Sequence, residues 1–386
     1  MAIHPGVLRV MCVLIALLTW SLAIEAAKQK QTRAIVTYAT NDVYAMSAVV
    51  LGRTLVAVGH GAEDKTELIV LVTAPVSSGA RTLLADVGWD VLEVAPIDPQ
   101  SADAKGSIPQ ATEDRDLNVE FGKLHAWKLR SKKDNKPFRR VLMIDADAYA
   151  KRPLDELFHS RFYRGTVTSR YERRSAKGIL FGGLLAFRAD PSFPDSVLEF
   201  ARTHVNTGMA LQGVLNDQLR EEWVNKPDNE RIPMWTHYGA SACMLSGNTA
   251  ASVHADVAQA LILDFQGVAK PWRWPEVTFP VCAVLTSYAQ VWAAVLLFPL
   301  ATKHLTIRSM LENVDSLPHT AEGMLSLASQ LAQQGMTSQD DPAAAAKERA
   351  RVRLIAKHVG WGVGAELLRV LEAAEAGAGV RQQEEE

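Results

Sequence analysis

A short apolar run that ends in two aspartates constrains the fold of this chain more than any other stretch. Residues 141–144 are β-branched or large and apolar, and Asp145 and Asp147 follow directly. An unbroken run of this kind predicts a strand buried on both faces, as in a parallel sheet with helices on either side. The ligand crevice of such a sheet lies at the carboxyl ends of its strands. Carboxylates in that place suit a hard divalent cation with a diphosphate; two solvated aspartates opening a loop are the alternative.

Strand and helix patterns alternate along the first hundred residues. Strands are predicted over 34–38, 68–72 and 89–95, and apolar stripes predict helices over 40–58 and 77–87. The order strand, helix, strand, helix, strand indicates a doubly wound α/β domain with right-handed crossovers. Further along the chain we expect a loop over 96–116, helices over 121–131, 193–204 and 213–223, and strands over 165–169, 179–187 and 260–265.

Composition narrows the class of protein. The 386 residues are 48% hydrophobic and carry a formal net charge of -2, which fits one large domain or two modest ones. Neither value favours a nucleic-acid partner or wholesale disorder. The three cysteines, at positions 12, 243 and 282, do not have the spacing of a zinc site.

The two ends of the chain differ from its middle. His4 and Arg9 precede an apolar run over 10–24, which predicts a secretory signal peptide or a retained membrane anchor. We therefore expect the protein in the Golgi or endoplasmic reticulum lumen, or secreted. A second apolar run, over 277–300, is interrupted by polar residues and predicts a buried helix. The expected division is a signal segment over 1–30, an α/β domain over 31–310 and a helical, partly disordered tail over 311–386.

Five segments, in order along the chain, resemble the motifs of glycosyltransferase family eight. They are Val36–Tyr44, Phe121–Trp127, Asp145–Asp147, Asn216–Gln218 and Asp264–Trp272. The resemblance extends over residues 34–272 and is closest to glycogenin-like members, with galactinol-synthase-like members also similar. It implies a GT-A type α/β fold, in which a Rossmann-like, mostly parallel sheet is flanked by helices and followed by a helical C-terminal extension.

The resemblance also implies an activity. It predicts a retaining, metal-dependent glycosyltransferase that moves a hexosyl unit from a UDP-sugar, with UDP-glucose or UDP-galactose favoured, to a saccharide, protein or small polyol acceptor. The alternatives are a UDP-glucuronic acid or UDP-xylose transferase acting on a polysaccharide, and a catalytically silent relative that binds the nucleotide sugar. Glycogenins carry an acceptor tyrosine in the segment that corresponds to residues 239–263, and this chain has none there. We therefore expect no self-glucosylation. Oligomers are compatible with the sequence.

Most candidate binding residues come from the same segments; Arg115, whose register no motif fixes, and Gly183 lie outside them. Tyrosine rings offer flat faces for uracil, short polar side chains offer hydrogen bonds, and lysines neutralise diphosphate oxygens. The predicted nucleotide-sugar-binding set is Tyr38, Thr40, Asn41, Tyr44, Arg115, Lys123, Asp145, Ala146, Asp147, Gly183, Gly267 and Lys270. Asp217, Gln218 and Lys123 are the predicted catalytic residues, Asp217 binding sugar hydroxyls and Gln218 facing the reaction centre.

The resemblance implies a metal site that departs from the family pattern. Asp145, Asp147 and Asp264 are the predicted ligands, and Asp264 stands where the family has a histidine. Three carboxylates suit manganese, with magnesium as the alternative; His237 and His254 are the alternative third ligands. Phe181–Gly183 replaces the family's Asn-x-Gly, which predicts an altered donor specificity.

Overall fold

The computed structural model describes residues 32–61, 64–97, 117–169, 179–203, 210–239, 250–265 and 342–358, with isolated residues between 270 and 372. The predicted signal segment, most of the 277–300 run, Arg115 and Gly267 lie outside the described residues. In the part that is described, no helix is long and apolar enough to span a membrane.

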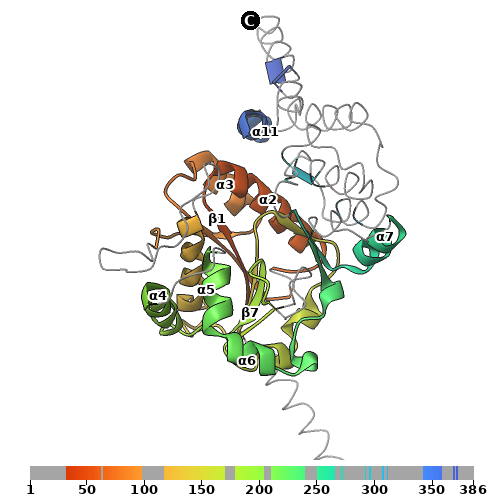
Figure 1. The fold of residues 1–386 in the computed structure, drawn as a ribbon. Coiled ribbons are helices and arrows are strands. Elements are labelled where there is room, and N and C mark those ends of the chain that lie inside the picture. Colours follow the sequence, from red (N-terminus) through yellow and green to blue (C-terminus); the bar gives the residue numbers. More distant parts are fainter. Residues whose placement is uncertain are drawn as a thin grey trace, which may run out of the picture.

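A six-stranded sheet forms the centre of the molecule (Figure 1). Its strand order is β3-β2-β1-β4-β7-β6. Its strands are β1 (Arg33–Ala39), β2 (Glu67–Val72), β3 (Asp90–Glu93), β4 (Arg140–Ile144), β6 (Val167–Thr168) and β7 (Leu184–Phe187). The first four are mutually parallel, whereas β7 runs antiparallel to both β4 and β6. This mostly parallel sheet confirms the predicted α/β class.

Alternate residues of each central strand enter two different cores. Leu142 and Ile144 of β4 pack on one face, together with α2 (Asp42–Ala57) and α3 (Ser78–Asp86). Val141 and Met143 pack on the other, with the 3₁₀ helix η1 (Leu117–Lys128), α4 (Phe193–Thr203) and α5 (Ala210–Gln218). Burial on both faces explains why the run over 141–144 contains no polar residue.

Each of the first two helices begins with a side-chain cap. The Asn41 side-chain oxygen accepts a hydrogen bond of 3.1 Å from the Tyr44 backbone N–H, and Ser77 caps α3 in the same way. The helix predicted over 121–131 is instead the 3₁₀ helix η1, which begins and ends earlier. The helix predicted over 213–223 is broken at Leu219 into α5 and α6 (Arg220–Asn225).

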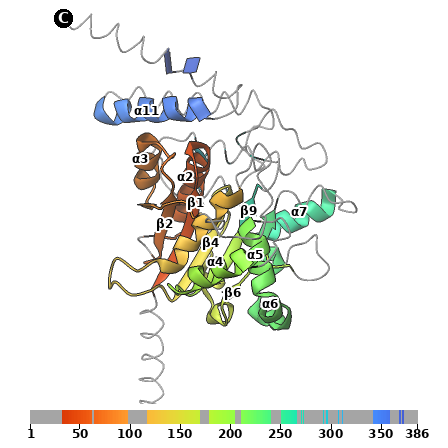
Figure 2. The same ribbon diagram turned by 60° about the vertical axis from the view of Figure 1, so that its left-hand side comes forward.

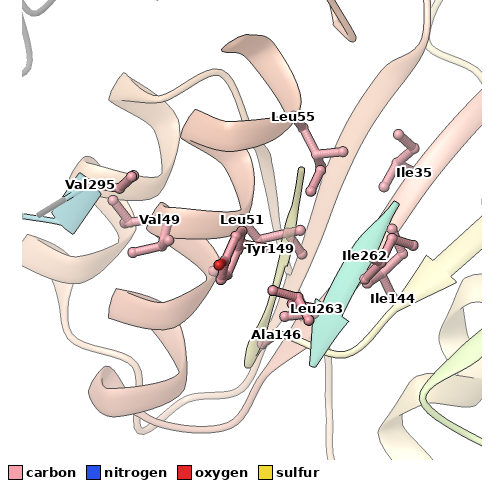
Figure 3. Close-up of a cluster of buried hydrophobic side chains, with 14 of the residues drawn as sticks. Ile35, Val49, Leu51, Leu55, Ile144, Ala146, Tyr149, Ile262, Leu263 and Val295 are labelled. Carbon is pink, nitrogen blue, oxygen red and sulfur yellow. The ribbon is translucent and has the colours of Figure 1, made fainter. Parts of the chain in front are cut away.

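A second, three-stranded sheet extends the crevice beyond β4. It has the order β5-β9-β8, formed by β5 (Ala148–Ala150), β9 (Ile262–Asp264) and β8 (His237–Gly239). Figure 3 shows its Tyr149, Ile262 and Leu263 in the same apolar cluster as Leu51 and Leu55 of α2. Because this small sheet is fixed against α2, it holds β9 next to the two aspartates that follow β4.

The described part of the C-terminal extension is helical, as predicted. Helix α11 (Pro342–His358) lies across α3 and α2, on the side away from the sheet (Figure 2). Its Val352 and Ile355 are fully buried, and Lys347 forms an ion pair with Asp86 of α3 at 2.7 Å. The helix is therefore packed against the α/β domain. Helix α7 (Ala250–Gln259) precedes β9.

Candidate nucleotide-sugar site

One cavity of about 460 Å³ lies where β1 and β4 end and α2 begins. It is lined by Tyr38, Thr40, Asn41, Tyr44, Thr73, Pro75, Pro96, Val119, Glu120, Lys123, Asp145, Ala146, Asp147 and Lys270. Nine of these belong to the predicted nucleotide-sugar-binding set. The remaining three of that set are Gly183, which lies behind Asp145, and Arg115 and Gly267, which are outside the described residues.

The aromatic side of the cavity is formed by Tyr38 and Tyr44. Tyr38 is only 5% exposed and lies against Gly122 of η1, where an added Cβ would be 2.2 Å from the tyrosine oxygen. The ring of Tyr44 meets that of Trp272 edge-on, with 5.3 Å between the centroids. The side-chain oxygen of Asn41 is engaged in capping α2, so a ligand would meet its amide nitrogen.

Two lysines from distant segments meet the two aspartates that follow β4. Lys123 Nζ lies 2.6 Å from Asp145 Oδ1, and Lys270 Nζ forms an ion pair with Asp147 Oδ2. The ammonium group of Lys270 also lies 5.7 Å from the ring centroid of Tyr44 and 5.5 Å from that of Trp272. The structure thus brings together the charged residues of three predicted motifs.

Burial and neighbouring charges oppose each other in this cluster. Burial lowers the pKa of Lys123, but the carboxylates of Asp145, Glu120 and Asp147 more than offset this, so that its pKa lies above the ordinary value. Burial raises the pKa of Asp147, which is 4% exposed, and the nearby Asp264 adds to that increase while Lys270 opposes it. A further positive charge beside Asp147 and Asp264 would therefore stabilise their ionised forms.

The predicted third metal ligand lies beside the pair. Asp264 is opposite Ala148 in the pairing of β9 with β5, and the backbone N–H of Phe265 donates to the carbonyl of Asp147 at 3.0 Å. The Asp264 side chain is buried, and its Oδ2 lies 3.5 Å from His237 Nε2. His237, which was predicted as an alternative to Asp264 as the third ligand, thus contacts the Asp264 carboxylate. His254 lies on α7.

The donor set fits a hard divalent cation in its chemistry. Three carboxylates, two of them buried, provide the oxygen ligands that manganese and magnesium prefer. Among the described residues, no three acidic, histidine or cysteine side chains are arranged closely enough to share a metal. Lys123 and Lys270 hold two of the three carboxylates instead. Asp145, Asp147 and Asp264 are the residues that would bind the cation once those ion pairs open.

The structure requires a correction for Asp217 and Gln218. Neither lines the cavity: Asp217 forms an ion pair of 2.8 Å with Arg220, and the Gln218 amide nitrogen lies 3.2 Å from Ser196 Oγ on α4. The reason is helical geometry, because both residues lie on a face of α5 that is turned away from the sheet edge.

Gln212, on another face of α5, contacts the loop that passes behind Asp145, although it does not line the cavity either. Its side-chain oxygen accepts a hydrogen bond of 2.8 Å from the backbone N–H of Gly182, next to Asp145. Asn216, one turn later, holds the same loop through both the N–H and the carbonyl of Leu180. Sequence reasoning missed Gln212. The signal that could have found it is the i, i+4 spacing of Gln212 and Asn216 on the face that also carries Leu211 and Leu215, both buried.

Phe181 and Gly183 shape the floor of the site. Phe181 is 3% exposed and its ring lies 5.0 Å from that of His237, so it serves as packing beneath the carboxylates. An added Cβ at Gly183 would lie 2.4 Å from the Phe181 ring and 2.8 Å from Asp145 Oδ2. Only glycine allows the backbone to pass this close, and its carbonyl accepts from the Asp145 N–H at 3.0 Å.

Known proteins with similar sequences are glycogenins. No family model matches the chain. Glycogenin-2 of Homo sapiens is 30% identical over 247 residues, covering 63% of this chain and 44% of the relative, and Glycogenin-1 of Caenorhabditis elegans is 28% identical, covering 63% and 51%. The chain thus spans about half the length of these relatives. The comparisons confirm the resemblance to glycogenins.

Solved glycosyltransferases resemble the chain in shape at low identity. The bifunctional glycosyltransferase WbbM aligns with a TM-score of 0.48 and 13% identity, covering 74% of this chain and 52% of that one. The galactosyltransferase LgtC, in complex with donor and acceptor sugar analogues, aligns with a TM-score of 0.45 and 14% identity, covering 68% and 95%.

Proposed function

We propose that this chain is a retaining, metal-dependent hexosyltransferase that uses a UDP-sugar, with UDP-glucose or UDP-galactose as the favoured donor. The observation that supports this most is the meeting of Lys123, Asp145, Asp147 and Lys270 in one cavity beside two tyrosines. Uracil would lie against the tyrosine rings, and the diphosphate would lie by the lysines. The glycogenin-like sequence supports the same reaction class.

Different residues of the site would bind the metal, the diphosphate and the sugar. Asp145, Asp147 and Asp264 would hold manganese or magnesium, which when bound supplies a Lewis acid for the departing diphosphate. Lys123 and Lys270 would leave their carboxylate partners and donate to diphosphate oxygens, stabilising the charge that develops there. Gln212 does not line the cavity, but it binds the Gly182 backbone of the loop that passes behind Asp145, and it would position that loop beside the sugar.

A second candidate is a silent relative that binds the nucleotide sugar without transferring it. The observation that favours it is that Lys123 and Lys270 already satisfy two carboxylates, the arrangement expected of a site that needs no metal. A donor change to UDP-glucuronic acid or UDP-xylose is the third, and the bulky Phe181 in the family's Asn-x-Gly position supports it.

One experiment separates these candidates. Purified protein is incubated with each of the four UDP-sugars in manganese, magnesium or EDTA, and UDP release is measured. Release from one donor, lost in EDTA and in Asp147→Ala but retained in Asp217→Ala, supports a transferase and names its sugar. Metal-dependent UDP binding without release, with and without saccharide, protein and polyol acceptors, supports the silent relative. No binding of UDP contradicts all three.

The acceptor and the compartment are part of the proposal. We propose an acceptor other than the chain itself, since no tyrosine occurs in residues 239–263. Mass spectrometry after incubation with the active donor tests this, because each self-transfer adds one hexose to the intact mass. We also propose entry into the secretory pathway through residues 1–30, which protease protection of the full chain in microsomes tests.

A further inference from the structure

A second cavity lies at the edge of the main sheet opposite the nucleotide cavity. It has a volume of about 420 Å³ and is lined by Arg139, Arg140, Ser160, Tyr163 and Arg188. The topology of the sheet places these residues at the same edge. Arg140 is the first residue of β4, whereas Asp145 follows its last, and Arg188 follows the end of the antiparallel β7. Neither cavity shares a lining residue with the other.

The cavity is strongly positive. Three of its five lining residues are arginines and none is acidic. Among the described residues, no carboxylate forms an ion pair with any of the three. Arg140 donates instead to the Phe158 carbonyl at 2.6 Å. The neighbouring Arg33, paired with Arg140 across β1 and β4, has both Asp64 and Asp155 as partners. Three like charges around one cavity repel each other, and a bound anion would relieve that repulsion.

A buried hydroxyl group completes the lining. Tyr163 is 2% exposed, and within the described part of the chain its hydroxyl has no hydrogen-bond partner. The ring is fixed by parallel contact with Phe158, at 6.4 Å between centroids, and by the Arg140 guanidinium 6.0 Å from its centre. Leaving a buried hydroxyl unsatisfied is costly, so an acceptor oxygen inside the cavity is the partner that this geometry calls for.

We propose that this cavity is a second ligand site, which binds the oxyanion of a phosphate or sulfate monoester. Guanidinium groups match tetrahedral oxyanions in charge and in the fork of their N–H donors. The Tyr163 and Ser160 hydroxyls add neutral donors. A volume of about 420 Å³ is in the range of small-molecule pockets and exceeds what a lone phosphate ion fills, which favours an ester with a group of sugar size.

Calorimetric titration of the full chain at low ionic strength tests the proposal, with glucose 6-phosphate, a sulfated hexose and inorganic phosphate as probes. We expect one or both esters to bind more tightly than inorganic phosphate. Tyr163→Phe should weaken ester binding about 10-fold or more, because it removes one hydrogen bond to a charged group. It should leave the melting temperature without ligand unchanged or higher. Arg139→Gln with Arg188→Gln should abolish binding.

Two control variants make the result specific to this cavity. Arg202→Gln makes the same Arg-to-Gln substitution once, at an exposed position of α4, and should leave ester affinity unchanged. Lys123→Met removes a cation from the nucleotide cavity, and it should also leave the affinity of the second cavity for the esters unchanged. Equal ester affinity in Tyr163→Phe, the double arginine variant and the wild type would overturn the proposal, as would loss of binding in Lys123→Met. Inorganic phosphate binding as tightly as both esters would overturn the assignment of an ester ligand.

Discussion

The contact between Gly122 and Tyr38 gives a quantitative prediction, because it joins the core of the fold to the proposed uracil surface. In Gly122→Ala the new Cβ would lie 2.2 Å from the Tyr38 oxygen and 2.5 Å from Cζ. Tyr38 is 5% exposed, and an added methyl group in a packed site costs about 1–3 kcal/mol. Replacing glycine inside a helix returns at most about 1 kcal/mol. The net loss therefore lies between about 0 and 3 kcal/mol, and we expect the free energy of unfolding to fall by a value near the middle of this range, about 1–2 kcal/mol.

The same displacement should alter ligand binding. If the Tyr38 ring moves, the stacking surface for uracil is lost, which corresponds to a contribution of about 1 kcal/mol or a roughly 5-fold weaker UDP affinity. Urea unfolding and calorimetric UDP titration measure the two effects. Gly79→Ala is the matched control, since its Cβ would lie 3.4 Å from Leu354, an ordinary contact, in the helix α3. Unchanged stability and unchanged UDP affinity in Gly122→Ala would refute the reasoning.

Three further predictions concern other parts of the molecule. Asp264→Asn removes one of two adjacent buried carboxylates, so we expect equal or higher stability in thermal melts, while the Kd for manganese in the presence of UDP rises by at least about 10-fold; unchanged manganese affinity would exclude Asp264 as a ligand. Gln212→Ala should lower transfer or UDP-sugar hydrolysis at least about 10-fold, whereas Gln218→Ala should have little effect; the reverse order would restore the original prediction. Burial raises the pKa of Asp64, but hydrogen bonds from His60 and Thr66 outweigh it and bring the pKa to about 2. Because this is below the unfolded value, the contribution is complete above about pH 4 and is lost as the pH falls to about 2, so the wild type should lose on the order of 1–2 kcal/mol more than Asp64→Asn over that interval in urea titrations.

Local sequence signals predicted the parts of the fold whose cause is local. The apolar run over 141–144 predicted β4 because a strand with helices on both faces has no polar side. The helix predicted over 40–58 begins close to its expected start because the Asn41 cap is a local feature, acting within three residues. Local signals also explain which site residues could be predicted. Tyr38, Tyr44, Lys123 and the two aspartates line one cavity because each lies in, or directly after, a strand or helix that the pattern had identified.

The predictions for Asp217 and Gln218 were wrong because the face of the helix on which a residue lies decides whether its side chain reaches the site. Asn216–Gln218 matched a short motif by letters, but successive residues of a helix point about 100° apart, so a motif alone does not say which of them reaches the site. The position of α5 against η1 and α4 turns Gln212 toward Gly182 and Gln218 toward Ser196. Such packing depends on contacts between residues far apart in the sequence, and no single segment contains that information.

The charges of the three carboxylates and the two lysines determine how a metal ion and a diphosphate could bind together. Asp145, Asp147 and Asp264 carry three negative charges when ionised, and Lys123 and Lys270 carry two positive ones. A dication that displaced both lysines would leave two ammonium groups in a largely buried site without partners, at a large desolvation cost. A diphosphate arriving with the cation gives the lysines new partners and removes that cost. Each ligand should then raise the affinity of the site for the other by the same factor, as thermodynamic linkage requires. Under the proposed function, the lysine–aspartate pairs would be the resting form of a site that metal and diphosphate complete together.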